Sequence, residues 1–157
     1  GLDRLAWQVR ARADGDQLLL ERAVSDSGNL HVPWEVEGHG RPTLSTACLN
    51  EQFGPYHLPL ELARGTIGQL RNQLAEWRAL GLNVAEKITE KAAEATALLG
   101  RAATSQEDLR TSGDLAQQAL RAALDAADLL VATYTDQAIA IRRRRGAKLP
   151  TVFGDGR

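Results

Sequence analysis

Two glutamates, Glu35 and Glu37, are two positions apart in a segment with strand-like alternation. Residues i and i+2 of a strand share a face, and paired carboxylates can do the acid and base work of glycoside hydrolysis. Both glutamates fall on the face that the alternation predicts to be solvated, and no supporting motif accompanies them. We therefore expect a solvated strand edge here and no catalytic residue in the chain.

The histidines and the cysteine are the residue types that could bind a metal or act as a nucleophile. His31, His39 and His57 are irregularly spaced, and no nearby cysteine or helical histidine pair offers converging ligands. They are expected to be surface or structural residues. The single cysteine, Cys48, has no resolving partner and is expected to be a small buried side chain. We expect no metal and no cofactor.

Three ring-bearing residues and one charged pair could bind a sugar. Trp34, Tyr56 and His57 could offer flat faces to a pyranose ring, although Trp34 occupies an apolar-face position, where a tryptophan more often belongs to the core. Glu61 and Arg64 are three residues apart at the start of a predicted helix and can form a charged pair. They could contact the sugar beside Tyr56 and His57. The alternative is that they hold the joint between the strand-rich and helical parts.

The run Arg142–Arg145 ends a predicted helix. It could contact nucleic acid or an anionic surface, or it could suit the negative end of the helix dipole. Docking onto an acidic face of a neighbouring domain is a third reading. The chain has 19 Lys and Arg against 20 Asp and Glu, so no global basic field attracts nucleic acid. No apolar run reaches the roughly 18 residues that a membrane span needs. We expect neither nucleic acid nor membrane as a partner.

The composition changes along the chain. Residues 1–57 hold all three His and most turn dipeptides, and residues 58–145 are rich in Ala, Leu and Gln. Alternation of period two predicts four short strands in the first part, joined as one antiparallel meander with an apolar face. Pro33 cannot donate a ladder hydrogen bond, which indicates an edge strand or a bulge. Such a sheet must pack on something else.

Apolar residues spaced by three and four predict helices in the second part. The expected inner faces comprise Ala63, Ile67, Leu70, Leu74 and Trp77, then Val84, Ile88, Ala92, Ala95, Leu99 and Ala102, then Leu115, Ala119, Ala122, Ala126, Leu130, Tyr134 and Ile141. The third helix is expected over about 115–144, after a break at 112–114. The fold class is α+β, with a small antiparallel lobe (1–57) and a helical hairpin or three-helix segment (58–145).

Glycines and one asparagine mark details of the first two helices. Gly65 and Gly68 weaken the first helix by roughly 1 kcal/mol each relative to Ala, so they indicate close approach of a neighbouring element. Gly81 is expected to cap this helix in the left-handed conformation, with Leu82 as its hydrophobic partner. Asn83, three residues before Glu86, resembles a capping box for the next helix.

Several strings in this order and spacing resemble one family. They are Asp26-Ser27-Gly28, Val32-Pro33-Trp34, Leu44-Ser45-Thr46-Ala47, Pro55-Tyr56-His57-Leu58, Glu61-Leu62-Ala63-Arg64-Gly65, Leu70-Arg71-Asn72-Gln73 and Lys148-Leu149-Pro150-Thr151. Over residues 2–152 the chain resembles the region before the catalytic barrel in large glycoside hydrolase family 10-like, xylanase-like proteins of planctomycete-type bacteria. The resemblance implies a retaining barrel with two catalytic glutamates, both C-terminal to this segment.

The resemblance therefore implies a non-catalytic accessory segment of an enzyme that acts on β-1,4-linked polysaccharide. Residues 146–157 would lead toward the chain's own catalytic barrel, although 153–157 depart from the expected pattern. Tyr56, His57, Trp34, Glu61 and Arg64 would support polysaccharide binding. The alternative is a structural interaction module, which docks through its apolar sheet face and helical stripe without a glycan role. The sequence lacks Met, so we expect a processed or excised piece of a longer protein.

Overall fold

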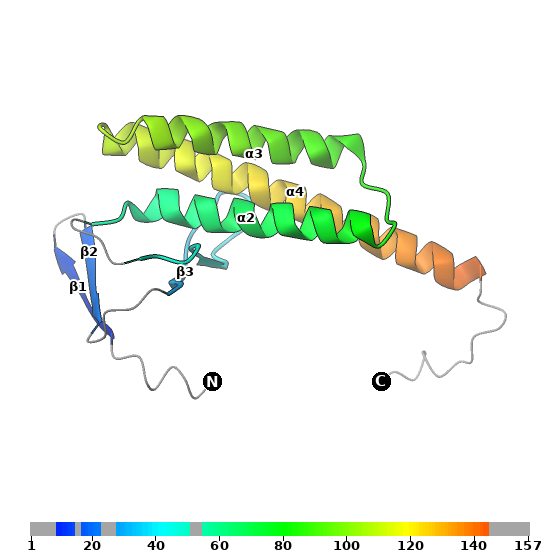
Figure 1. The fold of residues 1–157 in the computed structure, drawn as a ribbon, viewed down its shortest axis with the longest axis horizontal. Coiled ribbons are helices and arrows are strands. Elements are labelled where there is room, and N and C mark those ends of the chain that lie inside the picture. The colour runs from blue at the N-terminus through cyan, green and yellow to red at the C-terminus, as the bar shows by residue number, and fades with distance from the viewer. Residues whose placement is uncertain (1–8, 15–16, 23–27, 51–54, 145–157) are drawn as a thin grey trace.

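The computed structural model describes residues 9–14, 17–22, 28–50 and 55–144. Short strands come first and long helices follow (Figure 1), which confirms the α+β class. The elements are β1 (Val9–Asp14), β2 (Gln17–Arg22), β3 (His31–Pro33), β4 (Thr43–Ser45), α2 (Leu58–Ala79), α3 (Glu86–Thr104) and α4 (Leu109–Arg144). None of the helices in these ranges is long and apolar enough to cross a membrane.

The strands form two separate antiparallel pairs within the described ranges, so the prediction of one continuous meander is wrong. In the β1–β2 hairpin Asp14 pairs with Gln17. In the second pair Val32 faces Leu44. Pro33 lies in β3, which among the described residues pairs with β4 alone, consistent with the edge position that a proline requires. Residues 23–27, which join the two pairs in sequence, lie outside the described ranges.

The three helices run alternately up and down, and α4 packs along both α2 and α3 (Figure 1). The core lies among them and reaches Val36 and Leu44 of the strand-rich part. Its helical members include most of the residues that the periodicity predicts, namely Ala63, Ile67, Leu70, Leu74, Ile88, Ala92, Ala95, Ala102, Leu115, Ala119, Ala122, Ala126 and Leu130. The predicted Trp77, Val84 and Leu99 are only partly buried, and the core also contains residues that were not predicted, namely Leu60, Leu62, Ala116, Leu120 and Ala123. Alanine predominates on the inner faces of α3 and α4, which permits close contact between these helices.

The end of α2 follows the predicted capping pattern. Gly81 has φ +85°, and its N–H donates to the Arg78 carbonyl at 2.9 Å. The N–H of Leu82 donates to the Trp77 carbonyl at 3.1 Å. These two bonds define a Schellman motif, in which glycine takes the left-handed position because it has no Cβ. The predicted C-cap is therefore confirmed.

The predicted capping box at Asn83 is wrong. The N-cap of α3 is Ala85, and no side chain caps this end. The backbone of Asn83 is instead held by Gln137 of α4. The Gln137 amide donates to the Asn83 carbonyl at 2.8 Å and accepts from the Asn83 N–H at 3.3 Å. The Gln137 side chain thus satisfies the backbone N–H and C=O groups of Asn83 in the connection between α2 and α3.

The last helix begins at Leu109, six residues earlier than the sequence predicts. Asp108 accepts hydrogen bonds from the Arg110 and Thr111 N–H groups and from the Thr111 hydroxyl, which gives the new helix start an N-cap. Ser112 does not break the helix, because its hydroxyl is buried and donates to the Ala102 carbonyl at 2.8 Å. Ser112 is therefore part of a packed contact between α3 and α4, whereas Asp114 is exposed.

Only one of the two predicted close approaches is present. A Cβ on Gly65 would overlap the Ser45 carbonyl oxygen and come within 2.7 Å of the Thr46 carbonyl carbon. Nothing lies within 4 Å of a Cβ placed on Gly68. Gly65 therefore allows β4 to pack directly on α2, and the prediction for Gly68 is wrong.

The inner face predicted for α4 is buried only as far as Leu130. Tyr134 and Ile141 are 43% and 42% exposed, so their placement on an inner face is wrong. The reason is the length of α4, whose last turns extend past the end of α2 and the start of α3 (Figure 1). Tyr134 still stacks on Trp77 of α2, with ring centroids 4.8 Å apart.

Candidate functional site

Three of the predicted sugar-binding residues share one stripe at the start of α2. His57 is the N-cap, and its carbonyl accepts the first helical hydrogen bond from the Glu61 N–H at 3.1 Å. Glu61 and Arg64 follow four and seven positions after His57, and this spacing places residues on one face of a helix. Tyr56 directly precedes the N-cap. The helix start therefore brings four of the five candidate residues to one end of the helical layer.

Glu61 and Arg64 form the expected (i, i+3) pair. The Arg64 Nε lies 3.7 Å from the Glu61 Oε2, and the Glu61 side chain is 14% exposed. Burial raises the pKa of the Glu61 carboxyl above its ordinary value, and the Arg64 guanidinium opposes this effect. The carboxylate is thus only partly compensated, and it can accept another hydrogen bond.

His57 lies against the first turns of α4. A Cβ placed on Gly113 would lie 3.8 Å from the Cε1 and Nε2 atoms of the ring. The Nδ1 atom is buried and has no hydrogen-bond partner among the described residues. Desolvation by burial lowers the pKa of His57, so the neutral ring is favoured. A neutral imidazole has one donor and one acceptor nitrogen and can bind a hydroxyl in either sense.

The other two aromatic candidates use their polar atoms within the chain. The Tyr56 hydroxyl donates to the Asn50 carbonyl, and the Trp34 indole N–H donates to the Gln117 side-chain oxygen. Trp34 is half-buried and packs against the core, as its apolar-face position suggests. Gln117 comes one turn after Gly113, so Trp34 and His57 lie against consecutive turns of α4.

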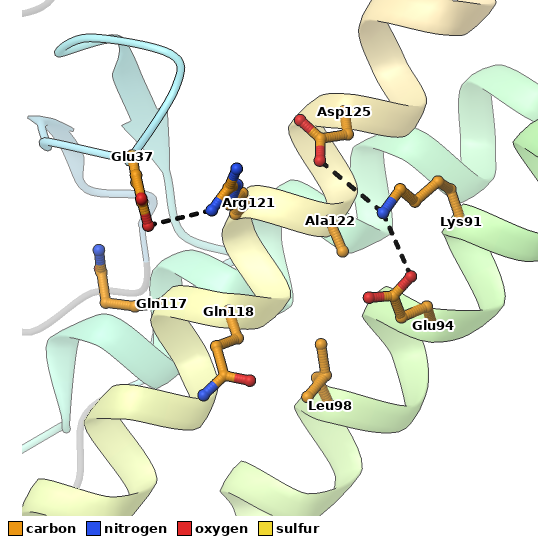
Figure 2. Close-up of a pocket in the computed structure, with 9 residues that line it drawn as sticks. All are labelled: Glu37, Lys91, Glu94, Leu98, Gln117, Gln118, Arg121, Ala122 and Asp125. Carbon is orange, nitrogen blue, oxygen red and sulfur yellow. Dashed lines mark hydrogen bonds and ion pairs between the residues drawn. The ribbon is translucent and has the colours of Figure 1, made fainter.

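A pocket of about 350 Å³ opens between α3 and α4, where the 36–40 turn meets α4 (Figure 2). The lining side chains are mostly charged or amide groups, namely Glu37, Lys91, Glu94, Gln117, Gln118, Arg121 and Asp125, with Leu98 and Ala122. Each of its two cations is already paired. Arg121 lies 3.0 Å from Glu37, and Lys91 lies 3.3 Å from Glu94. An anionic ligand would have to displace these carboxylates.

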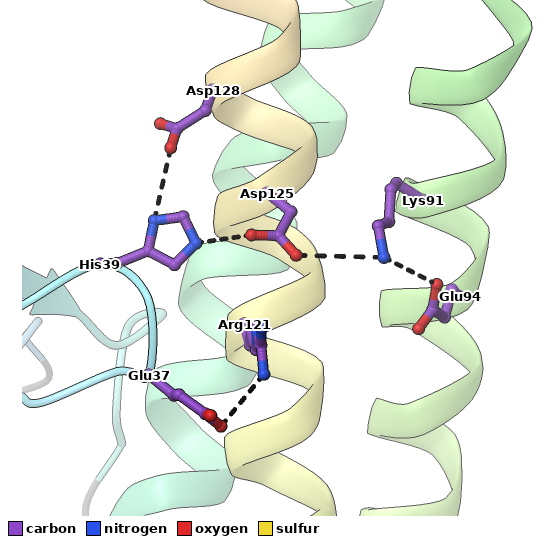
Figure 3. A network of polar contacts seen from close by, with 7 residues as sticks. All are labelled: Glu37, His39, Lys91, Glu94, Arg121, Asp125 and Asp128. Atoms are coloured by element: carbon purple, nitrogen blue, oxygen red, sulfur yellow. Dashed lines mark hydrogen bonds and ion pairs between the residues drawn. The ribbon is translucent and has the colours of Figure 1, made fainter.

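His39, at the tip of the 36–40 turn, is one of the residues that hold the strand-rich part on α4 (Figure 3). Its Nε2 lies 2.7 Å from Asp125 and its Nδ1 3.4 Å from Asp128, and its side chain is 12% exposed. Asp125 also lies 3.9 Å from Lys91 of α3. His39 is thus a structural histidine, one of the two roles expected of it. Asp125 and Asp128 were not candidates, and their only local signal is the (i, i+3) spacing.

The remaining expectations have mixed outcomes. Glu35 and Glu37 are both exposed, as predicted, but they follow the end of β3 and do not lie on a strand edge. His31 is exposed, and its Nδ1 is 2.8 Å from the Ser45 hydroxyl. Cys48 is also exposed, so its predicted burial is wrong: the chain beyond β4 runs along the surface at this position. Over the described residues no group of three or more His, Cys, Asp and Glu side chains is arranged to hold a metal ion.

Comparisons with known protein families, with curated proteins and with solved structures find no match to this chain.

Proposed function

We propose that this chain is a non-catalytic accessory segment of a glycoside hydrolase family 10-like protein, and that it supports binding of a β-1,4-linked polysaccharide. The sequence resemblance gives the protein class. The proposed location of the polysaccharide-binding surface rests on one observation, the shared stripe of His57, Glu61 and Arg64 beside Tyr56. The chain's own C-terminal barrel, for which residues 146–157 would be the linker, is the proposed intramolecular partner.

The stripe has the chemistry that a sugar requires. Glu61 supplies a carboxylate acceptor and Arg64 supplies guanidinium donors, so neighbouring hydroxyls of one pyranose can be bound as donor and acceptor. The rings of His57 and Tyr56 extend the surface. Trp34 is the least suited of the five candidates, because its indole N–H is bonded to Gln117.

Titration of the 157-residue chain with xylohexaose, followed by amide NMR, tests this proposal. We expect shifts confined to residues around 56–64. Glu61→Gln and Arg64→Gln should abolish them, whereas the exposed controls Glu90→Gln on α3 and Arg71→Gln on α2 should not. Absence of shifts at millimolar xylohexaose and cellohexaose would overturn the glycan role. Sequencing the gene on both sides tests the class separately, since a barrel with two catalytic glutamates should follow.

A second candidate function is a protein-interaction module without a glycan role. It is favoured by large apolar side chains that the fold leaves exposed, namely Leu80, Leu109, Val131, Tyr134, Ile139 and Ile141. Most of them lie on the last turns of α4. Association that depends on protein concentration and is unaffected by glycan would support this candidate over the first.

A further inference from the structure

An apolar seam runs along the exposed end of α4. We define the outer seam as Val131, Tyr134, Ala138 and Ile141, whose spacing of three, four and three is that of a heptad repeat. Val131, Tyr134 and Ile141 are 51%, 43% and 42% exposed, and Ala138 is half-buried. The same spacing leads back through Ala127 and Leu124 to the fully buried Leu120. A continuous core seam of α4 therefore emerges from the bundle. Beyond Tyr134, whose ring stacks on Trp77 of α2, the seam has no apolar partner among the described residues.

We propose that the outer seam pairs with the outer seam of a second copy of this chain, with the two α4 helices antiparallel. The proposal deepens the interaction-module candidate and does not depend on glycan binding. A second copy is the partner because two outer seams that run in opposite directions are complementary in both shape and charge.

Shape complementarity comes from the order of the side chains. In an antiparallel pair centred near residue 136, Val131 faces Ile141 of the other copy and Tyr134 faces Ala138. Each large ring then meets a small side chain, and such alternation fills a core evenly. In a parallel pair Tyr134 would face Tyr134 and Ala138 would face Ala138, which crowds one layer and leaves space in the next.

The charged residues along α4 also favour antiparallel pairing. The seam ends at the basic turn Arg142–Arg144, and the preceding turns carry Asp125 and Asp128. Asp128 is 76% exposed even though it contacts His39. A parallel pair would place the two basic turns together, and like charges at that separation repel. An antiparallel pair places the basic turn of each copy near the aspartates of the other.

The first experiment is sedimentation equilibrium of the whole chain at increasing concentration. We expect a monomer–dimer equilibrium, and Ile141→Glu should raise the dimer Kd by about ten-fold or more, because it places a charge in the seam. Ile139→Glu is the matched control: it is the same substitution at a 41% exposed isoleucine two residues away, outside the seam. It should change the Kd by less than about three-fold.

The second experiment tests direction by disulfide formation in a Cys48→Ser background. Mixing the Val131→Cys and Ile141→Cys chains should give a cross-linked dimer faster than either chain alone. Faster self-cross-linking of each variant would indicate parallel pairing and overturn the proposal. A chain that stays monomeric up to about 1 mM also overturns it. So does a monomeric chain that binds phosphatidylglycerol vesicles through the basic turn, because the seam would then be occupied by a lipid surface.

Discussion

Gly65 of α2 lies directly against the backbone of Ser45, the last residue of β4, so that no side chain separates helix from strand. This contact is where the strand-rich part is seated on the helical layer. Thr46, the next residue, is buried, and its hydroxyl accepts a hydrogen bond from the Leu30 N–H at 3.0 Å. A shift of the Ser45–Thr46 backbone would therefore also disturb the pairing between the two strand segments.

Replacing Gly65 by alanine should destabilise the fold. The added Cβ would overlap backbone atoms, which cannot rotate away as a flexible side chain can. We expect Gly65→Ala to lower the free energy of unfolding by about 1–3 kcal/mol. Gly68→Ala, in the same helix with open space around its Cβ, should raise it by up to about 1 kcal/mol through helix propensity. Urea denaturation of both variants measures this difference, and equal effects would contradict the contact.

The pairing of His39 with Asp125 should show as a coupling energy. Their atoms are 2.7 Å apart and the histidine is almost fully buried, so a double-mutant cycle with His39→Ala and Asp125→Ala should give roughly 1–2 kcal/mol. The cycle with Asp128→Ala should give a smaller value, because that contact is 3.4 Å long and Asp128 is exposed. Equal couplings would mean that the two carboxylates are interchangeable.

Adjacent glutamines on α4 offer a matched comparison. Gln117 accepts from the Trp34 indole and donates to the Glu35 carbonyl at 3.2 Å, so one amide joins α4 to the segment after β3. Gln118 is exposed. We expect Gln117→Ala to cost about 1–2 kcal/mol of unfolding free energy and to shift the Trp34 indole N–H resonance. Gln118→Ala should do neither. An unchanged indole resonance in the first variant would show that the bond is absent in solution.

The helices could be predicted from the sequence because burial within them follows a local period. Leu70, Ile88 and Ala119 are buried where a repeat of 3.6 places them. The sequence period does not depend on where the neighbouring helices end. It therefore also predicts an inner-face position for Ile141. How far α2 and α3 extend beside α4 decides that exposure, and this is a property of three segments together.

Contacts between distant segments could not be predicted for the same reason. His39 meets Asp125 across 86 residues, and nothing in either local pattern names the other. Gly65 and Gly68 look alike in sequence, yet only the first lies under β4. The ion pair between Glu61 and Arg64 could be predicted from the sequence, because both residues belong to one helical turn.

The raised pKa of Glu61 predicts that the folding stability falls as the pH rises above the ordinary pKa of a glutamate. Burial raises it above the ordinary value of 4.5, so the folded state holds this proton more tightly than the unfolded state does. Stability from this group is therefore fully present below pH 4.5 and is lost as the pH rises through the raised pKa. Wild type should lose stability relative to Glu61→Gln over that interval. Urea denaturation of both proteins from pH 4 toward neutrality measures the change, and a constant difference would contradict it.

The lowered pKa of His57 predicts the opposite trend, a loss of folding stability as the pH falls below 6.5. Desolvation lowers its pKa below the ordinary value of 6.5, so the unfolded state binds this proton more readily than the folded state does. The stabilising contribution of the neutral ring is complete above pH 6.5 and is lost as the pH falls toward the lowered pKa. Relative to His57→Gln, wild type should therefore become less stable on acidification below pH 6.5. If a glycan hydroxyl donates to the imidazole ring, xylohexaose should stabilise the neutral ring and lower the pKa of His57 further. NMR titration of the ring protons with and without the sugar measures that shift, and a pKa that stays the same would separate His57 from the proposed glycan surface.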